Sequence, residues 1–560
     1  MGSSCHAHKL WHVIERVAGT HLGLRAGLAI VAGVATALGF APFGWWPLLF
    51  PGVAGLSLVV LGASRLRQAL LLGWCYGLGY MGLGLNWMSA IFIEAMVGLV
   101  LVVSLIYILL AGLIFALRRL PLWPVGAAAA WVAVEALISR WPFDGFGWMR
   151  LGYTMTDAPL SGLYPLIGVA GMTFVIALIG QALLWLTDPA ARSLRAVPRL
   201  ADPASRSADP ASPSVIPAKA GISRPASARK RLLTSLAGLL IIALGSGAGA
   251  LIPPGAPTGE TTSVGWVQGG APGGGVYGIG PPRTTTTNHL AETKALFERV
   301  AADAEPAPDF VIWPENGTDL DPHYDAETAA MVSEALRVAG VPILVGTILS
   351  GPGADERQTA SLWLDPVQGE LERYIKRGIV PFGEFVPFRD ILLPLIPQLR
   401  YVGAQSIPGS EPGVITARTA TSEFPLGVLI CYDVSFDHIV YDTVRHGGQA
   451  LVVQSSNAMY QGTGQIDQQF AITRARAAEL RREVLVVTTS GVSGLIRADG
   501  SVDFSVSEHG AASGVVELPL RGGVTPAVAV APILELAGVL LALALAGWGA
   551  FTGRRRFRSG

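Results

Sequence analysis

The sequence predicts a multi-pass α-helical membrane domain joined to an α/β domain. Hydrophobic residues make up 51% of the chain and charged residues only 14%, and the mean hydropathy is +0.48. The apolar residues concentrate in 24–187, 232–252 and 528–551, whereas 253–527 has the composition of an ordinary globular domain. In that domain, short Val- and Ile-rich runs alternate with helical segments, as is typical of α/β layers.

About eight apolar segments are candidates for membrane-spanning helices. A helix needs roughly 20 residues to cross the hydrocarbon core of a bilayer, and buried helices of soluble proteins rarely run this long without a polar face. The segments are 24–41, 47–63, 69–86, 93–116, 122–138, 163–186, 232–252 and 528–551.

Basic residues in alternate connections predict the orientation of these helices. Lys and Arg favour cytoplasmic loops, and they occur near Arg65, near Arg118, in 187–231 and after Arg554. We therefore expect both termini in the cytoplasm. The expected organisation is a cytoplasmic tail (1–23), a membrane domain (24–252) with a disordered basic loop (187–231), an outer domain (253–527), and a last helix with a basic tail (528–560).

The outer domain contains runs that predict a sheet buried on both faces. The runs are continuous rather than alternating in polarity, which is typical of buried parallel strands. Strands are expected at Ser263–Gln268, Asp309–Trp313, Pro342–Leu349, Gly427–Ile430, Ala450–Gln454 and Glu483–Thr489, and helices at Thr285–Ala302, Ala326–Val338 and Gln465–Arg482.

Three polar groups follow such strands. Glu315 ends the stretch WPE, Lys376 follows a strand and precedes Glu384, and Cys431 begins CYD. Functional side chains on parallel sheets gather past the carboxyl ends of strands. A carboxylate can take a thiol proton and a lysine can hold a developing oxyanion, so the set suits a thiolate that attacks a carbonyl group.

Each residue also has a simpler structural explanation. Glu315 fits a surface carboxylate, Lys376 a solvated cation, and Cys431 a small hydrophobic core residue. Against this, Cys431 is the only cysteine of the predicted outer domain, since the other two are Cys5 and Cys75. It therefore has no partner for a disulfide, and a leftover thiol indicates reactivity.

The sequence motifs around these three residues resemble the Glu–Lys–Cys signature of the nitrilase superfamily. VPFGEFVPF (380–388), together with the membrane segments, is similar to the apolipoprotein N-acyltransferase family. FAPFGWWPL (40–48), GFGWMRLGY (145–153) and TTSGVSGLI (488–496) resemble further segments of that family, so the resemblance covers nearly the whole chain except 187–231.

The resemblance implies an α-β-β-α sandwich on the outer face of a bacterial inner membrane. It implies acyl transfer from a phospholipid to the α-amine of the N-terminal diacylglyceryl-cysteine of an apolipoprotein. Glu315 would be the general base, Lys376 the oxyanion stabiliser and Cys431 the acylated nucleophile. No metal or other cofactor is implied; the equal count of 40 basic and 40 acidic residues gives no indication of nucleic acid. We expect a monomer.

Further site residues follow from the same resemblance. Glu384 would support the lysine, the backbone N–H of Tyr432 would donate to the oxyanion, and Asp433 stands where the family often has glutamate. Around 458 the family commonly has Ser-Asn-Asp followed by an aromatic residue, and this chain departs from that pattern. Most aromatic residues of the outer loops are expected to anchor at the interface. The candidates for substrate or lipid contact are Trp148, Tyr153, Met459 and Tyr460.

Two other functions use the same features. A membrane-tethered amidase would employ the same three residues with water as acceptor, although a soluble substrate needs only one anchor. A membrane protein that binds a ligand without chemistry would tolerate replacement of Cys431 by Ser.

Overall fold

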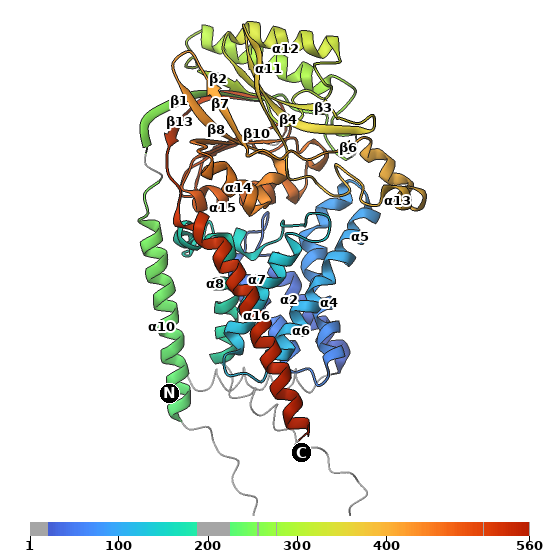
Figure 1. Cartoon of the computed structure of the whole chain (residues 1–560), viewed down its shortest axis with the longest axis vertical. Coiled ribbons are helices and arrows are strands. Elements are labelled where there is room, and N and C mark those ends of the chain that lie inside the picture. The colour runs from blue at the N-terminus through green and yellow to red at the C-terminus, as the bar shows by residue number, and fades with distance from the viewer. Residues whose placement is uncertain (1–20, 187–224, 255–256, 276, 508, 559–560) are drawn as a thin grey trace, which may run out of the picture.

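The computed structural model describes residues 21–186, 225–254, 257–275, 277–507 and 509–558. It has a bundle of long helices at one end and a domain of two sheets and flanking helices at the other (Figure 1). The helices of the bundle are α2 (Leu22–Ala37), α3 (Leu49–Leu61), α4 (Leu66–Gly84), α5 (Ile93–Ser104), α6 (Ile106–Leu117), α7 (Trp123–Ile138), α8 (Tyr164–Leu186), α10 (Pro225–Ala250) and α16 (Pro526–Arg558).

The eight apolar segments all coincide with helices of this bundle, the fourth being divided between α5 and α6. By length and composition, four helical stretches of the described chain are able to cross a membrane: Ile93–Leu117, Ser161–Leu186, Leu233–Ala250 and Pro526–Phe551. Three shorter apolar helices accompany them, at Leu22–Ala37, Trp46–Leu61 and Trp123–Ile138.

The ends of two helices differ from the predicted limits. Helix α10 begins at Pro225, within the segment that was expected to be a disordered loop, and α16 continues to Arg558 through the expected basic tail. Proline is favoured in the first turn of a helix because its missing N–H is not needed there, which accounts for the start of α10. Most of the predicted tail (1–20) and loop (187–224) lies outside the described residues.

The second domain contains two sheets. The first has seven strands in the order β13-β1-β2-β3-β4-β5, with β6 paired to β4, and the second has six in the order β12-β11-β10-β9-β8-β7. The first sheet comprises β1 (Pro257–Gln268), β2 (Phe310–Ile312), β3 (Ile343–Ser350), β4 (Glu356–Asp365), β5 (Gly369–Ile375), β6 (Gln405–Ser406) and β13 (Ala512–Arg521). The second comprises β7 (Val414–Arg418), β8 (Glu423–Ile430), β9 (Ala450–Ser455), β10 (Val484–Thr488), β11 (Gly494–Ile496) and β12 (Val502–Ser505).

Both sheets are parallel at the centre and antiparallel at the sides. β1, β2 and β3 run parallel, as do β8, β9 and β10, and these are the six strands that the continuous apolar runs predicted. The remaining strands pair antiparallel, except for the two-residue β6, which pairs parallel to β4.

Helices cover the outer face of each sheet, which completes an α-β-β-α sandwich. Helices α11 (Thr284–Ala301) and α12 (Ala326–Ala339) lie on the first sheet, away from the bundle, whereas α14 (Asp437–Arg445) and α15 (Gly464–Leu480) lie between the second sheet and the bundle (Figure 1). The sequence of α12 explains where this helix begins and ends. Asp325 caps its first turn by accepting from Thr328 N, and Gly340 ends it in the left-handed conformation.

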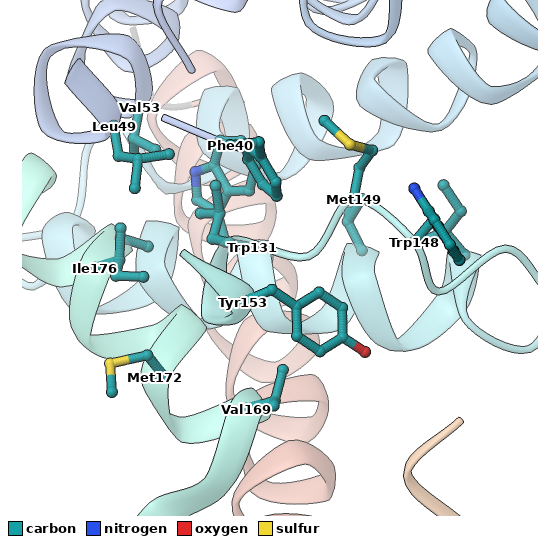
Figure 2. Close-up of a cluster of buried hydrophobic side chains, with 14 of the residues drawn as sticks. Phe40, Leu49, Val53, Trp131, Trp148, Met149, Tyr153, Val169, Met172 and Ile176 are labelled. Atoms are coloured by element: carbon teal, nitrogen blue, oxygen red, sulfur yellow. The ribbon is translucent and has the colours of Figure 1, made fainter. Parts of the chain in front are cut away.

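Three clusters of buried side chains hold the layers together. One lies between the sheets and includes Trp363, Leu426 and Val452, and a second lies beneath α11 and α12. The third runs without a break from the outer face of the second sheet, through α14 and α15, into the helical bundle. Figure 2 shows its membrane-domain part, with Trp131, Trp148 and Tyr153 among the side chains.

A buried network of charged side chains joins the helical bundle to helices α14 and α15 of the second domain. Arg150, in the connection between α7 and α8, bonds Asp437 Oδ1 at 2.7 Å, and Arg476 of α15 bonds Asp437 at 2.6 Å and Glu479 at 2.7 Å. Glu479 also accepts from the backbone N–H of Val169 at 2.9 Å. That contact requires glycine at 168, because a Cβ there would lie 2.5 Å from Glu479 Oε1 and φ is +62°.

Candidate active site

Glu315, Lys376 and Cys431 all follow strands of the sandwich at one edge. Glu315 comes shortly after β2 and Lys376 directly after β5, and these two strands point the same way because β3, β4 and β5 alternate in direction. Cys431 comes directly after β8 of the other sheet. The two sheets therefore deliver their carboxylate, ammonium and thiol groups to one place, as the strand ends predicted.

Lys376 lies between two carboxylates. Its Nζ donates to Glu315 Oε1 at 2.9 Å and to Glu384 Oε1 at 3.0 Å, and its side chain is 1% exposed. Burial alone lowers the pKa of this ammonium, but the two carboxylates outweigh burial and raise the pKa well above the ordinary value. Lys376 is therefore a fixed positive charge within the site.

Hydrogen bonds hold both the side chain and the backbone of Glu315 in place. Its Oε2 accepts from the backbone N–H of Ser456 at 2.9 Å, and its carbonyl oxygen accepts from Thr489 Oγ1 at 2.8 Å. Gly346 of β3 passes so close that a Cβ would lie 2.0 Å from the carbonyl oxygen of Pro314. The carboxylate is thus held by the residue that follows β9, and the backbone at 314–315 by β3 and by the residue that follows β10.

Cys431 lies in a tight turn with left-handed backbone geometry. Its φ is +50°, which is unfavourable for a residue with a Cβ and persists only when the surroundings impose it. A short 3₁₀ helix, η8 (Cys431–Ser435), begins at this point. The turn takes Cys431 out of the line of β8. Its side chain packs at the margin of the core between the sheets, and its thiol lies close enough to Glu315, Lys376 and Glu384 for all three to affect its pKa.

Electrostatics keep the resting thiol protonated. Burial raises the pKa of Cys431, the carboxylates of Glu315 and Glu384 raise it further, and Lys376 and a hydrogen bond from Gln469 lower it. The net direction is upward. Among the charged neighbours of the thiol, Glu315 affects this pKa most.

Asp433 connects the cysteine turn to the loop that carries Lys376. Its Oδ2 accepts from Ile430 N at 2.9 Å and from the Tyr374 hydroxyl at 2.9 Å, and its Oδ1 accepts from Gly378 N at 2.7 Å. Burial raises the pKa of this carboxyl to about 6, against the lowering by these donors. The shorter acid that departs from the family pattern therefore still reaches three partners.

Glu384 closes the opposite side of the loop. Its carboxylate accepts from Lys376 and also from Val380 N at 2.9 Å, and its backbone carbonyl accepts from Ser406 N at 2.9 Å. Glu384 therefore fixes both the lysine and the turn 380–386. The segment that follows, α13 (Arg389–Leu395), projects sideways from the sandwich near α5 (Figure 1).

Trp148 and Tyr153, two of the candidates for substrate or lipid contact, are buried inside the protein. Trp148 is 4% exposed and donates to Gln468 Oε1 at 2.8 Å, and its ring lies 5.8 Å from that of Tyr432. Tyr153 is 2% exposed and accepts from Arg476 at 3.1 Å. Both are interior residues at the junction of the two domains, because the aromatic loop of the membrane domain packs under α15 instead of facing solvent or lipid.

Met459 and Tyr460 belong to the segment that departs from the family pattern. They form a short helix, η9 (Ala458–Tyr460), whose carbonyl groups at 458 and 459 accept from Gly274 N and Gly275 N. Tyr460 packs edge-on against Trp87, with 5.3 Å between ring centroids. Its hydroxyl is close enough to the site for Cys431, Glu384 and Lys376 to influence its pKa, which burial raises.

The sequence patterns did not indicate Gln469. Its Nε2 donates to Cys431 Sγ at 3.3 Å. This contact joins a helix to a strand end across 38 positions of sequence, and no local pattern encodes such a pairing. A polar residue on the buried face of a predicted helix is the one signal that could have indicated it, since buried amides need partners.

Two family models match the chain. The Apolipoprotein N-acyltransferase N-terminal domain matches residues 32–182, and Carbon-nitrogen hydrolase matches residues 275–511. An apolipoprotein N-acyltransferase from Mycolicibacterium smegmatis is 32% identical over 528 residues, which is 92% of this chain and 84% of the relative. The chain belongs to the apolipoprotein N-acyltransferase family.

Other members of the family align over similar lengths. The relative from Pseudomonas aeruginosa is 27% identical over 93% of this chain and 95% of its own, and that from Methylococcus capsulatus is 27% identical over 84% and 86%. Among solved structures, a mutant amidase of the nitrilase superfamily from Nesterenkonia is 16% identical, with a TM-score of 0.34, and covers 48% of this chain and 93% of its own. By the residues matched, the first family model lies in the helical bundle and the second in the sandwich domain.

Proposed function

We propose that this enzyme transfers a fatty acyl chain from a membrane phospholipid, through a thioester at Cys431, to the α-amine of the N-terminal diacylglyceryl-cysteine of an apolipoprotein. One observation carries the proposal: a thiol, a carboxylate and a buried lysine meet on a domain that is packed against a bundle of apolar helices. Membership of the family supplies the substrate class.

In the first step, Glu315 takes the proton of Cys431 as the thiolate attacks the ester carbonyl carbon of the phospholipid. The oxyanion that forms is stabilised by the Lys376 ammonium and by the backbone N–H of Tyr432. The tetrahedral intermediate collapses with cleavage of the ester C–O bond. The departing alkoxide takes the proton from Glu315, which releases a lysophospholipid and leaves the acyl group on the sulfur.

In the second step, the free α-amine of the acceptor attacks the thioester carbonyl carbon. Glu315 takes a proton from the attacking nitrogen, and the same donors stabilise the second oxyanion. The C–S bond then breaks and the thiolate regains the proton, so the enzyme returns to its starting state with an amide as product. Because the two substrates share one site in turn, ping-pong kinetics are expected.

The membrane setting suits two lipid substrates. We place the eight helical segments across the bacterial inner membrane, with both termini in the cytoplasm and the sandwich on the periplasmic side, because the basic residues fall in alternate connections. Trp45 and Trp141 are exposed and lie next to the ends of helices, where aromatic residues commonly anchor at the interface. A single chain contains all the groups that the reaction uses, so we propose a monomer.

Intact mass spectrometry after incubation with phospholipid and no acceptor tests the proposal. We expect a mass increase of one acyl chain that maps to Cys431 and is absent in Cys431→Ser. A diacylated lipopeptide should then remove the acyl group and gain it at its amine. Absence of acylation with every phospholipid would refute the thioester, and release by water alone would indicate an amidase.

A further inference from the structure

The side chain of Gln469 is in contact with the sulfur atom that reacts. Gln469 lies on α15, is 3% exposed, and places Nε2 3.3 Å from Cys431 Sγ. Its Oε1 accepts from Asn457 Nδ2 at 2.7 Å, and Asn457 is 5% exposed. These contacts form a chain of donors from Asn457 through Gln469 to the sulfur.

Asn457 determines which end of the glutamine amide faces the sulfur. An amide has a donor end and an acceptor end, and Asn457 donates to the acceptor end, so the N–H₂ group is left facing Cys431. The backbone of Asn457 is held in place, and its side chain lies close to Gly491. Its φ is +56°, its carbonyl oxygen accepts from Tyr460 N at 2.9 Å, and a Cβ at Gly491 would lie only 3.0 Å from its Nδ2.

We propose that Gln469 is a further catalytic residue, which stabilises the Cys431 thiolate by donating to it, and that Asn457 is the positioning residue that orients the Gln469 amide. The inference rests on the proposed function, in which the thiolate is the nucleophile of the first step and the leaving group of the second. A donor to the sulfur assists both steps, because negative charge develops on the same atom each time.

The surroundings of the sulfur explain why a neutral donor is useful. The carboxylates of Glu315 and Glu384 lie near the thiol of Cys431 and disfavour a negative charge on its sulfur. The positive charge of Lys376 is already engaged by both carboxylates. Among the described residues, Cys431 Sγ is the one hydrogen-bond partner of Gln469 Nε2, while Oε1 of the same amide accepts from Asn457.

The test compares two neighbouring glutamines that receive the same substitution. Gln469→Met keeps the length of the side chain and removes the donor to the sulfur. Gln468→Met is the matched control, because Gln468 is 6% exposed on the same helix but bonds Trp87, Trp148 and the carbonyl oxygen of Gly84 instead. The readout is the rate of alkylation of Cys431 by iodoacetamide in full-length protein, followed by peptide mass spectrometry.

We expect Gln469→Met to lower this rate at least about tenfold at a fixed pH, which corresponds to about 1.4 kcal/mol. Gln468→Met should leave it within about twofold. Unchanged alkylation of Gln469→Met, or equal slowing in both variants, would overturn the proposal, since equal slowing would reflect a general disturbance of α15. Alkylation needs no lipid, so this outcome is independent of whether acyl transfer itself is demonstrated.

A double-mutant cycle tests the role of Asn457. Asn457→Gly suits the left-handed backbone and removes only the side-chain donor. It should slow alkylation several-fold in the native protein and have no further effect in the Gln469→Met background. Additive slowing would show that Asn457 acts on the sulfur by another route and would refute its positioning role.

Discussion

Lys376 Nζ donates to Glu315 Oε1 at 2.9 Å, which ties the group proposed to hold the oxyanion directly to the proposed base. The bond joins the ends of β5 and β2, two strands separated by β3 and β4 in the same sheet. The lysine is 1% exposed and the glutamate 5%. The two roles are therefore coupled, because a change in the charge of one group alters the surroundings of the other.

Replacing Lys376 by Met should abolish acyl-enzyme formation and weaken the fold. Loss of one oxyanion donor typically costs about 10²- to 10³-fold in rate. It also leaves Glu315 and Glu384 as buried carboxylates without their cation, and breaking a buried pair costs about 3–5 kcal/mol. The rate of acylation by mass spectrometry and thermal unfolding in detergent measure the two effects.

The double variant Lys376→Met with Glu315→Gln separates these effects. It removes one of the two buried carboxylates that lack a cation, so part of the lost free energy of unfolding should return. Acylation should stay absent. Acylation of Lys376→Met within tenfold of the native rate would contradict the proposed role of the lysine.

Replacing Arg476 by Met should lower the free energy of unfolding, because it breaks the buried charge network between the two domains. Arg476 is 1% exposed and bonds Asp437, Glu479 and the carbonyl oxygen of Val434, which lies in the turn that begins with Cys431. Its loss should cost about 3–5 kcal/mol, as expected for a broken buried ion pair. The free energy of unfolding in a denaturant series is the measurement.

Arg474→Met is the matched control two positions away on α15. Arg474 pairs with Asp157, whose side chain is 70% exposed, and an exposed pair contributes at most about 1 kcal/mol. Comparable destabilisation by the two substitutions would mean that the buried network does not hold the domains together.

His289 should make the protein less stable as the pH falls from 7 to 4. It is fully buried beneath Trp313, and burial lowers its pKa from 6.5 to about 4. The unfolded chain therefore binds a proton in this interval that the folded protein excludes. Stability that is present above pH 6.5 is lost as the pH falls through this range, to an extent of about 3 kcal/mol.

His289→Phe should reduce this loss, because phenylalanine keeps the contact with Trp313 and cannot titrate. His446→Phe, at an exposed position after α14, is the control and should retain the native pH dependence. Thermal unfolding from pH 4 to 7 gives the comparison, and parallel curves for the native protein and His289→Phe would refute the expectation.

The α/β class and the six central strands could be predicted because buried parallel strands are written as continuous runs of apolar residues. β9 and β10 are examples, with Val452, Val453, Val486 and Val487 all buried. The antiparallel strands at the sides, such as β4 and β13, contain polar residues and face partly outward, so their sequences carry no comparable run. Their pairing depends on tertiary contacts.

The candidate site could be predicted to the extent that it lies at strand ends. Glu315, Lys376 and Cys431 were found in this way, and the structure brings their side chains to one edge of the sandwich. Gln469 was not found, because its partner Cys431 lies 38 positions away in sequence. Trp148 and Tyr153 were candidates for substrate or lipid contact because aromatic residues of such loops commonly lie at the membrane interface, and the sequence does not show that this loop packs under α15.

The third core cluster runs from the second sheet into the helical bundle without a gap. In mechanical terms, interlocked side chains set the height of the Cys431 sulfur above the helical bundle, and the segment between β13 and α16 does not. A fatty ester and a lipid-anchored amine both arrive at a depth that the membrane dictates. A rigid mount lets the sulfur meet each of them at that depth, so a lengthened linker would leave the reach of the enzyme unchanged.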